Sequence, residues 1–397
     1  MFGQVVSDYN ITLLPGDGTG NEVVSEAKKV LDAIQDNSNI GFDFTAIECG
    51  GLHYKEHGKE WAEGSFEICR DESDAILLGA IGWPGVRRKN GDLAGGEVVL
   101  GLRAGLELYA NVRPIKLYEG VSHKVHGKFT KVWDSEKVDL LILRENTEGL
   151  YYNTLQRSVK RIKGESFREY PVIDFPELGD EVAWDPRPIS RKGTERVVRR
   201  AFDYATKRDT SLENKKVTCV DKSNVTKGCQ LFRSVFDEIS QEFPSISTTH
   251  AYVDAFAMWM VRNPEDFDVV VSPNLFGDII TDLGSVLQGG MGMAASGNIG
   301  DSHGLFEPVH GSSPKYTGMN KVNPIAAINS AQMMLEWIGN TKGDSDATKA
   351  AKILSQCVGE HISTDAILTY DLGGSATTSQ VGDAIANRVG STIRELM

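Results

Sequence analysis

The sequence predicts an α/β fold, in which helices cover the faces of β-sheets. Short apolar runs of strand length alternate with stretches of helical length over most of the chain, which is the pattern of that fold class. The clearest example is Val269–Gly284, where an apolar strand, Asp268–Ser272, passes through a Ser-Pro-Asn turn into a helix. In α/β proteins, ligands bind at such junctions between a strand and a helix.

The first half of the chain supplies strands and helices in turn. A strand at Ile11–Leu14 ends in the glycine-rich turn Pro15–Gly20, which is not the G-x-G-x-x-G fingerprint of Rossmann domains. A second glycine-rich loop, Gly79–Gly96, lies between a strand and a helix. The other elements expected in this half are strands at Phe42–Glu48, Ala75–Leu78, Ala110–Ile115 and Val138–Leu143, and helices at Asn21–Gln35 and Glu97–Leu108.

The second half continues the alternation after an irregular segment. Residues 153–185 are polar and poorly periodic, so we interpret them as an excursion from the core, either a surface insertion or an arm that meets another subunit. A loop is expected from 294 to His310. The remaining expected strands are Lys216–Asp221 and Ser247–Val253, and a helix is expected between them that ends near Phe243. Further helices are expected at Lys192–Lys207, Pro324–Ile338, Ala347–His361 and Gln380–Arg394.

Composition and charge narrow the class of protein. About a quarter of the 397 residues are charged and 40% are hydrophobic, as in ordinary globular proteins, and this length suggests two or three domains. The formal charge of −13 argues against nucleic acid or an anionic membrane as a partner. Five scattered cysteines, no signal peptide and no apolar run long enough to span a membrane predict a reduced, cytoplasmic setting.

The helix of the central stretch carries two carboxylates. Asp278 and Asp282 are four residues apart, so both project from one helical face. Like charges at this spacing repel by roughly 0.2–0.5 kcal/mol, and the apolar character of this helix argues against a merely solvated face. Hard oxygen ligands on a rigid helix suit Mg²⁺ or Mn²⁺.

Further charged residues occur where strands end or where helices face inward. Arginines can bind carboxylate groups in bidentate fashion, aspartates can share one divalent cation, and a tyrosine and a lysine can give and take protons. The set indicates a small anionic substrate held on a metal, although each member alone could equally be a surface ion pair. It comprises Arg103, Arg113, Arg144, Tyr151, Lys222, Asp254, Asp278 and Asp282.

Seven short strings of the sequence carry a resemblance. They are LPGDGTG at 14–20, LRAGLELYANVRP at 102–114, RENTEGLY at 144–151, DKSNV at 221–225, YVDA at 252–255, NLFGDIITDL at 274–283 and FEPVHGS at 306–312. In this order, over nearly the whole chain, they resemble the isocitrate/3-isopropylmalate dehydrogenase family of metal-dependent β-decarboxylating dehydrogenases. Each string is modest by itself, but the set is very specific.

The resemblance implies a role for each residue of the charged set. The three arginines would bind the substrate carboxylates, and the three aspartates would hold Mg²⁺ or Mn²⁺. Lys222 would remove the proton of the substrate hydroxyl, and Tyr151 would protonate the enol after CO₂ leaves. In this family, Lys222 and Asp254 would reach into the site from the neighbouring subunit.

The resemblance also implies the architecture of that family, which is a two-domain, non-Rossmann fold. Residues 1–108 and 289–397 would form a discontinuous cofactor-binding domain. Residues 109–288 would form the domain for substrate binding and dimerisation. The enzyme would be an obligate homodimer, with residues of about 146–188 as an interlocking arm.

The cofactor loop of the family begins here at His310 and Gly311. Members that use NAD typically carry an aspartate where this chain has Lys315, whereas NADP-dependent isocitrate dehydrogenases resemble it at this position. Those enzymes have an arginine where this chain has Gly374, so one charged contact is missing. The resemblance favours NADP, with NAD as the alternative. The implied cofactor-binding residues are His310, Gly311, Lys315, Tyr316, Val322, Asn323 and Tyr370.

Substrate specificity in the family comes from the helix that leads to Arg103. Isocitrate enzymes place Ser and Asn where this chain has Glu97 and Val99; an ionised glutamate would oppose a third carboxylate, and a valine offers no hydrogen bond. Val99 and Leu100 resemble the two leucines that isopropylmalate enzymes use, but the glutamate of those enzymes corresponds to Gly96 here. The pocket is therefore expected to be partly apolar and suited to 3-isopropylmalate or a relative.

Several alternatives remain open from the sequence. D-malate and tartrate dehydrogenases also carry leucines at the two apolar positions, and their R-K-G string is echoed at 191–193. Isocitrate, homoisocitrate and a further anionic substrate read by the basic triplet 87–89 are other possibilities. A non-catalytic regulatory subunit would tend to lose catalytic or metal residues, and this chain retains Tyr151, Lys222 and all three aspartates.

Overall fold

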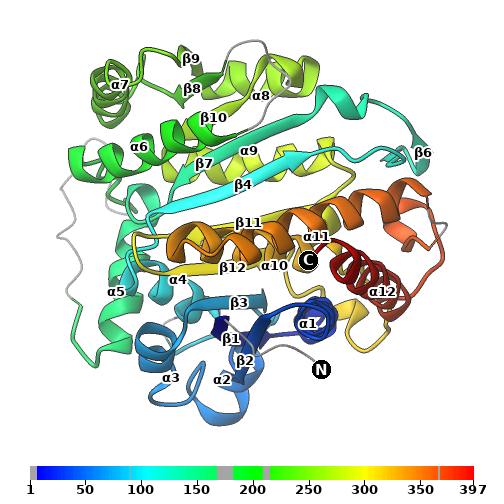
Figure 1. The fold of residues 1–397 in the computed structure, drawn as a ribbon. Helices are drawn as coiled ribbons and strands as arrows, with labels where there is room; N and C mark the ends of the chain where they lie inside the picture. Colours follow the sequence, from blue (N-terminus) through cyan, green and yellow to red (C-terminus); the bar gives the residue numbers. More distant parts are fainter. Residues whose placement is uncertain (1–6, 90, 168–181, 209–214, 365–366) are drawn as a thin grey trace.

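A sheet of ten strands runs through the middle of the molecule (Figure 1). The computed structural model describes residues 7–89, 91–167, 182–208, 215–364 and 367–397, and the strands and helices are those of these residues. Along the sheet the strands follow the order β2-β1-β3-β12-β11-β4-β7-β10-β8-β9. Their bounds are Ser7–Gly16 (β1), Ile40–Ala46 (β2), Ala75–Ala80 (β3), Ala110–Lys116 (β4), Asp139–Glu145 (β7), Lys216–Asp221 (β8), Ser247–Tyr252 (β9), Val269–Ser272 (β10), Ala295–Ile299 (β11) and Gly304–Pro308 (β12).

Helices cover both faces of this sheet, which confirms the predicted α/β class. In Figure 1, α6 and α10 lie in front of the central strands and α9 lies behind them. The longer helices are Gly20–Gln35 (α1), Gly96–Gly105 (α4), Tyr152–Ile162 (α5), Arg191–Lys207 (α6), Lys227–Ser240 (α7), Val253–Arg262 (α8), Asn274–Leu287 (α9), Ile325–Lys342 (α10), Ser345–Thr364 (α11) and Thr378–Leu396 (α12). No described helix is long and apolar enough to cross a membrane.

The middle of the sheet is antiparallel, while its outer strands pair in parallel. β11 pairs antiparallel with both β12 and β4, and β4 pairs antiparallel with β7. The domain division predicted from the sequence falls between β11 and β4, so that each side contributes five strands. Because the sheet is continuous across this boundary, the two domains stay a prediction.

The predicted loop from 294 to His310 is wrong, because it contains the two central strands β11 and β12. Their residues are small or polar, as in Ala-Ser-Gly-Asn-Ile, and have weak intrinsic strand propensity. Every residue of β11 is nevertheless buried, and its backbone is paired on both sides. Long-range pairing therefore overrides local preference here.

The expected irregular segment at 153–185 is only partly irregular. It begins with α5, and the residues 168–181 lie outside the described part of the chain, so the predicted arm at 146–188 is described only at its ends. α5 packs closely on α4 at a glycine, because a Cβ atom at Gly101 would lie 2.1 Å from the Ile162 side chain. Buried Leu155 and Val159 supply the apolar face that the charged neighbours conceal in the sequence.

β7 ends in a buried acid whose ionisation is coupled to folding. The Glu145 carboxylate accepts hydrogen bonds from the Thr147 hydroxyl (2.6 Å) and from the N–H groups of Thr147 (2.8 Å) and Glu148 (2.9 Å). Burial, together with the nearby charge of Glu148, raises the pKa of Glu145 to about 7 from its ordinary 4.5.

We expect the Glu145→Gln variant to be less sensitive to pH than the wild type. Between pH 4.5 and 7 the folded chain holds the Glu145 proton more tightly than the unfolded chain, so wild-type stability falls as the pH rises through this window. Urea unfolding of both proteins at pH 5, 6, 7 and 8 measures this difference. The exposed variant Glu242→Gln is the control, and parallel pH curves for wild type and Glu145→Gln would contradict the assignment.

Candidate active site

A cavity of about 180 Å³ opens at the end of β3, β11 and β12 and beneath α4. It contains two of the predicted substrate-binding arginines, Arg103 and Arg113, and the predicted apolar residue Val99. The predicted cofactor residues His310 and Gly311 line it as well. The rest of the lining is Gly79, Ala80, Ile81, Ser296, Glu307, Pro308 and Val309.

α9 faces the buried arginines of the neighbouring strands with polar side chains. Arg144, on β7, donates hydrogen bonds to the Asn274 amide oxygen at 2.7 and 2.9 Å and forms an ion pair with Asp278. Arg113, on β4, lies 3.1 Å from Asp282 and 3.7 Å from Asp278. The Ser-Pro-Asn turn thus starts a helix that presents carboxylates to cations on the sheet.

The surroundings of the buried arginines disfavour their positive charge, so a bound anion would stabilise them. Burial and the neighbouring guanidinium of Arg103 lower the pKa of Arg144, and burial lowers the pKa of Arg113. The buried Nε atoms of Arg103 and Arg113 make no hydrogen bond within the described residues, although Arg103 also donates a 3.0 Å bond to Glu307. Carboxylates are the natural partners of such donors.

Tyr151 lies against this cluster and keeps its proton at neutral pH. Its hydroxyl donates a 2.8 Å hydrogen bond to Asp278, and its ring lies 5.3 Å from the guanidinium of Arg144. Burial, and then the Asp278 carboxylate, raise the pKa of Tyr151. The pKa of Asp278 itself is lowered: although burial acts to raise it, Arg144 and the Tyr151 hydrogen bond outweigh that effect. Tyr151 is thus a neutral donor next to an ionised carboxylate.

Lys222 and Asp254 form a separate pair at the other end of the sheet. Lys222 follows β8 and Asp254 lies in the first turn of α8, and their side chains meet at 2.7 Å. The Asp254 side chain is 68% exposed, and the hydrogen bond from Lys222 lowers its pKa. Among the described residues, no three His, Cys, Asp or Glu side chains come together in a group that could hold a metal. A single chain therefore brings together Asp278 and Asp282 without Asp254.

A divalent cation fits the α9 carboxylates in chemistry but needs a further ligand. Asp278 and Asp282 are oxygen donors on one helical face, with side chains 31% and 50% exposed, and Mg²⁺ and Mn²⁺ prefer such donors. They would have to exchange part of their contact with the arginines for the cation. The carboxylates of an anionic substrate would then form ion pairs with the released guanidinium groups.

Glu97, expected from the sequence at the substrate, lies outside the cavity. Its carboxylate forms ion pairs with Arg88 and Arg161, each at 2.8 Å. Arg88 is further held by the fully buried side chain of Glu60. Glu60 also accepts a 2.8 Å hydrogen bond from the Glu97 N–H at the start of α4. Arg88, the middle residue of the basic triplet 87–89, is thus held in ion pairs within the chain and is not available to bind a substrate anion.

The glycine-rich turn after β1 supports the predicted cofactor loop. The Thr19 N–H donates a 2.9 Å hydrogen bond to the Ser312 carbonyl oxygen. Gly18 has a φ of +59°, and a Cβ atom there would lie 2.1 Å from that oxygen, so only glycine permits this approach. The buried Nε2 atom of His310 has no hydrogen-bond partner among the described residues, which suits a bound polar group.

Two tyrosines and two lysines gather at the far end of this loop. The rings of Tyr316 and Tyr370 lie 5.7 Å apart. Lys315 lies 4.7 Å from the Tyr316 ring, and Lys321 lies 4.9 Å from the Tyr370 ring and 5.9 Å from the Tyr316 ring. Hydrogen bonding from Tyr370, then Lys315, lowers the pKa of Tyr316. Lys321 was missed from the sequence, because its proximity to Tyr370 depends on the fold.

The other two predicted cofactor residues have structural contacts. The Asn323 amide donates a 3.1 Å hydrogen bond to Asp371 and accepts a 3.0 Å bond from the N–H of Ile325, at the start of α10. The Val322 carbonyl oxygen accepts a 2.6 Å bond from Thr378. Their roles in binding a cofactor stay predictions. The half-buried side chain of Val322 takes no part in these hydrogen bonds.

Comparisons with known proteins identify the family. The sequence matches the family model described as isocitrate/isopropylmalate dehydrogenase over residues 10–385. A 3-isopropylmalate dehydrogenase from Clostridium acetobutylicum is 37% identical over 336 residues, 84% of this chain and 87% of that protein. A 3-isopropylmalate/3-methylmalate dehydrogenase from Methanocaldococcus jannaschii is 36% identical over 382 residues, 96% of this chain and 99% of that protein.

Solved structures agree with this match. An isocitrate dehydrogenase from Methylococcus capsulatus has a TM-score of 0.76 and 34% identity, covering 96% of this chain and 99% of that one. A β-decarboxylating dehydrogenase from Thermococcus kodakarensis has a TM-score of 0.71 and 32% identity, covering 98% and 99%. The chain therefore belongs to the isocitrate/isopropylmalate dehydrogenase family, which confirms the resemblance drawn from its motifs and places it among the dehydrogenases.

Proposed function

We propose that the protein catalyses the NADP-dependent oxidative decarboxylation of a 3-substituted malate, with 3-isopropylmalate as its first candidate substrate. The observation that carries this proposal is the meeting of Arg113 and Arg144 with the α9 carboxylates, next to a cavity that Arg103, Arg113 and Val99 line. Such a site would bind two carboxylates and a metal and leave an apolar wall for the substituent. The names of the relatives from Clostridium acetobutylicum and Methanocaldococcus jannaschii support the same substrate class.

The residues of the chain divide the work of the proposed reaction. The arginines bind and orient the two carboxylates. Lys222 takes the proton of the substrate hydroxyl, and Tyr151 gives its proton to the carbon that CO₂ has left. Asp278, Asp282 and Asp254 would hold Mg²⁺ or Mn²⁺, which would supply positive charge next to the substrate oxygen, and the bound nucleotide would supply the hydride acceptor.

The wall of the cavity favours an apolar substituent over a third carboxylate. Val99 lines the cavity, and Leu100 is half-buried beside it on α4. A Cβ atom on Gly96 would meet only the Leu100 side chain, at 4.0 Å, so there is room for a bulky group here. With Glu97 and Arg88 paired to each other, neither is available to select an anionic substituent.

An absorbance assay at 340 nm with Mg²⁺ tests the substrate. It crosses NAD and NADP with 3-isopropylmalate, 3-methylmalate, isocitrate, homoisocitrate, D-malate and tartrate. We expect the highest kcat/KM with 3-isopropylmalate, and a loss of about 10²–10⁴-fold in kcat for Tyr151→Phe with little change in KM. A preference for isocitrate or homoisocitrate would contradict the apolar wall, and full activity of Tyr151→Phe would refute its role as proton donor.

The proposed active site includes Lys222 and Asp254 from a second copy of the chain. Four apolar side chains of α8 and α9, Met258, Trp259, Ile279 and Val286, are 42% to 58% exposed. Exposed apolar patches of this kind mark protein interfaces. The Lys222–Asp254 pair lies next to these side chains in the sequence, because Asp254 is in the first turn of α8 itself. Dimerisation through α8 and α9 would therefore place this pair close to the partner's α9.

Complementation between two inactive variants tests the shared site. If Tyr151 and Lys222 of one site come from different chains, a mixed dimer of Tyr151→Phe with Lys222→Met has one intact site and one doubly altered site. Random mixing at equal amounts should then restore about a quarter of wild-type activity, because half of the dimers are mixed and each has one working site. Co-expression with two affinity tags isolates the mixed dimer. If it is inactive although each chain is folded, the two residues act within one chain.

NADP is the proposed cofactor because the end of the loop offers several groups to a 2′-phosphate. Lys315, Tyr316 and Tyr370 were predicted from the sequence, and Lys321 lies beside the same two tyrosines. An arginine at Gly374 is excluded in this backbone, because a Cβ atom there would lie 1.9 Å from the Leu368 carbonyl oxygen. Lys321 would supply the charge that Gly374 cannot carry.

Removing this charge should weaken NADP binding selectively. We expect Lys321→Ala to raise the KM for NADP by roughly three- to tenfold and to leave the KM for NAD unchanged, since one exposed charge-assisted contact to phosphate is lost. Lys192→Ala, an exposed lysine on α6, is the matched control. An equal rise of both KM values, or no change in either, would remove Lys321 from the cofactor site.

A further inference from the structure

A second, larger cavity of about 580 Å³ lies on the opposite face of the same central strands. Its floor includes Val112 of β4, Ile299 of β11 and Phe306 of β12. The active-site cavity is lined by the adjacent residues of these strands, among them Arg113 and Glu307. Successive residues of a strand point to opposite faces, so one layer of backbone separates the two cavities.

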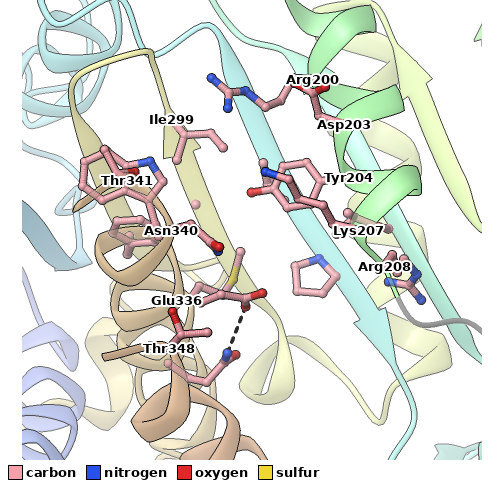
Figure 2. Close-up of a pocket in the computed structure, with 18 of the residues that line it drawn as sticks. Arg200, Asp203, Tyr204, Lys207, Arg208, Ile299, Glu336, Asn340, Thr341 and Thr348 are labelled. Atoms are coloured by element: carbon pink, nitrogen blue, oxygen red, sulfur yellow. Dashed lines mark hydrogen bonds between the residues drawn. The ribbon is translucent and has the colours of Figure 1, made fainter. Parts of the chain in front are cut away.

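The walls of this second cavity come from helices on the two sides of the β4–β11 boundary. Figure 2 shows Tyr204 and Lys207 of α6 on one side, with Asn340 and Glu336 of α10 on the other. The Trp337 ring forms an apolar part of the α10 wall and contacts Phe306, with ring centroids 5.9 Å apart. A volume of this size is typical of pockets for small organic ligands.

Several polar groups of the walls have no internal partner. Lys207 of α6 forms no ion pair with another described residue, and the Tyr204 hydroxyl makes no hydrogen bond within the same part of the chain. On the facing wall the only hydrogen bond of Glu336 to a described residue comes from Gln332, at 3.2 Å. Burial raises the pKa of Tyr204, which therefore stays a neutral hydrogen-bond donor.

The two arginines of the walls are already compensated. Arg208 lies 2.6 Å from Asp139 and 2.9 Å from Asp268. Arg200 donates a 2.8 Å hydrogen bond to the Tyr109 hydroxyl and lies 3.3 Å from Asp301. The charged side chains of the walls that form no ion pair within the described residues are therefore Lys207 and Asp203 on α6, and Glu336 and Lys352 on α10 and α11, above an apolar and aromatic floor.

We infer that this cavity binds a small zwitterion with an apolar side chain, of the chemical class of the apolar α-amino acids. The ligand carboxylate contacts Lys207 and Tyr204, its ammonium contacts Glu336, and its side chain packs on Phe306 and Trp337. A zwitterion matches walls that carry both cations and anions better than a singly charged ligand does, because a ligand of one charge leaves the wall groups of the same sign without a partner.

Occupation of this cavity should act on the active site. The strands that form its floor also carry Arg113, Ser296 and Glu307 to the active-site cavity. The two walls belong to the two halves of the sheet, so a ligand that joins α6 to α10 fixes the position of one half against the other. By linkage, any change that this ligand makes in substrate affinity is matched by an equal effect of substrate on the affinity for the ligand.

Isothermal titration calorimetry with the unmodified, full-length chain tests the inference without relying on catalysis. The probes are L-phenylalanine and two analogues that each lack one charge, 3-phenylpropanoate and 2-phenylethylamine. We expect L-phenylalanine to bind at least tenfold more tightly than either analogue. Absence of binding by L-phenylalanine up to 10 mM, or equal binding by an analogue, would overturn the assignment of a zwitterion site.

Variants place the binding in this cavity. Asn340→Trp should fill it and abolish the binding heat, and Lys207→Met should weaken binding about tenfold, whereas Lys192→Met on the same helix should have no effect. Circular dichroism and basal turnover confirm that each variant is folded, since none of these residues contacts the active-site cavity. Binding that persists unchanged in folded Asn340→Trp and Lys207→Met would locate the ligand elsewhere and refute the inference.

Discussion

Charge neutralisation between α9 and the central strands is the interaction on which the candidate active site depends. Taking a guanidinium group out of water costs several kcal/mol unless partners face it. Arg113 and Arg144 are buried in the sheet because Asn274, Asp278 and Asp282 of α9 lie opposite them. These contacts hold the arginines proposed to bind substrate and the proposed metal ligands together in one folded chain.

The pleat of the sheet gives the same strands two different environments. Arg113 and Glu307 point to the active-site cavity, while the adjacent Val112 and Phe306 point to the larger cavity between α6 and α10. The polar face is held by α4 and α9, and the other face is apolar with charged walls. Any ligand that moves β4 or β11 on one face therefore displaces side chains on the other, because both sets share one backbone.

Most of the fold could be predicted from local patterns, and the elements that were not predicted share one cause. The helix that carries Asp278 and Asp282, and the strands before it, follow from apolar runs and a turn. By contrast, β11 and β12 consist of small or polar residues, and they form strands because their neighbours in the sheet pair with them. α5 was not predicted for the same reason: its apolar side chains are recognised as a buried face only when the helix packs on α4, where Ile162 lies against Gly101.

The types of functional group and their local spacing can be taken from the amino-acid sequence, and they identify the family and the class of chemistry. The spacing of Asp278 and Asp282 on one helix, for example, is fixed by the helical period. Which groups become partners depends on the folded chain: Glu97 pairs with Arg88 and Arg161, Lys321 approaches Tyr370, and Asp254 lies apart from the other aspartates. These contacts join residues far apart along the chain, and their geometry depends on the packing of whole elements, which local spacing does not specify.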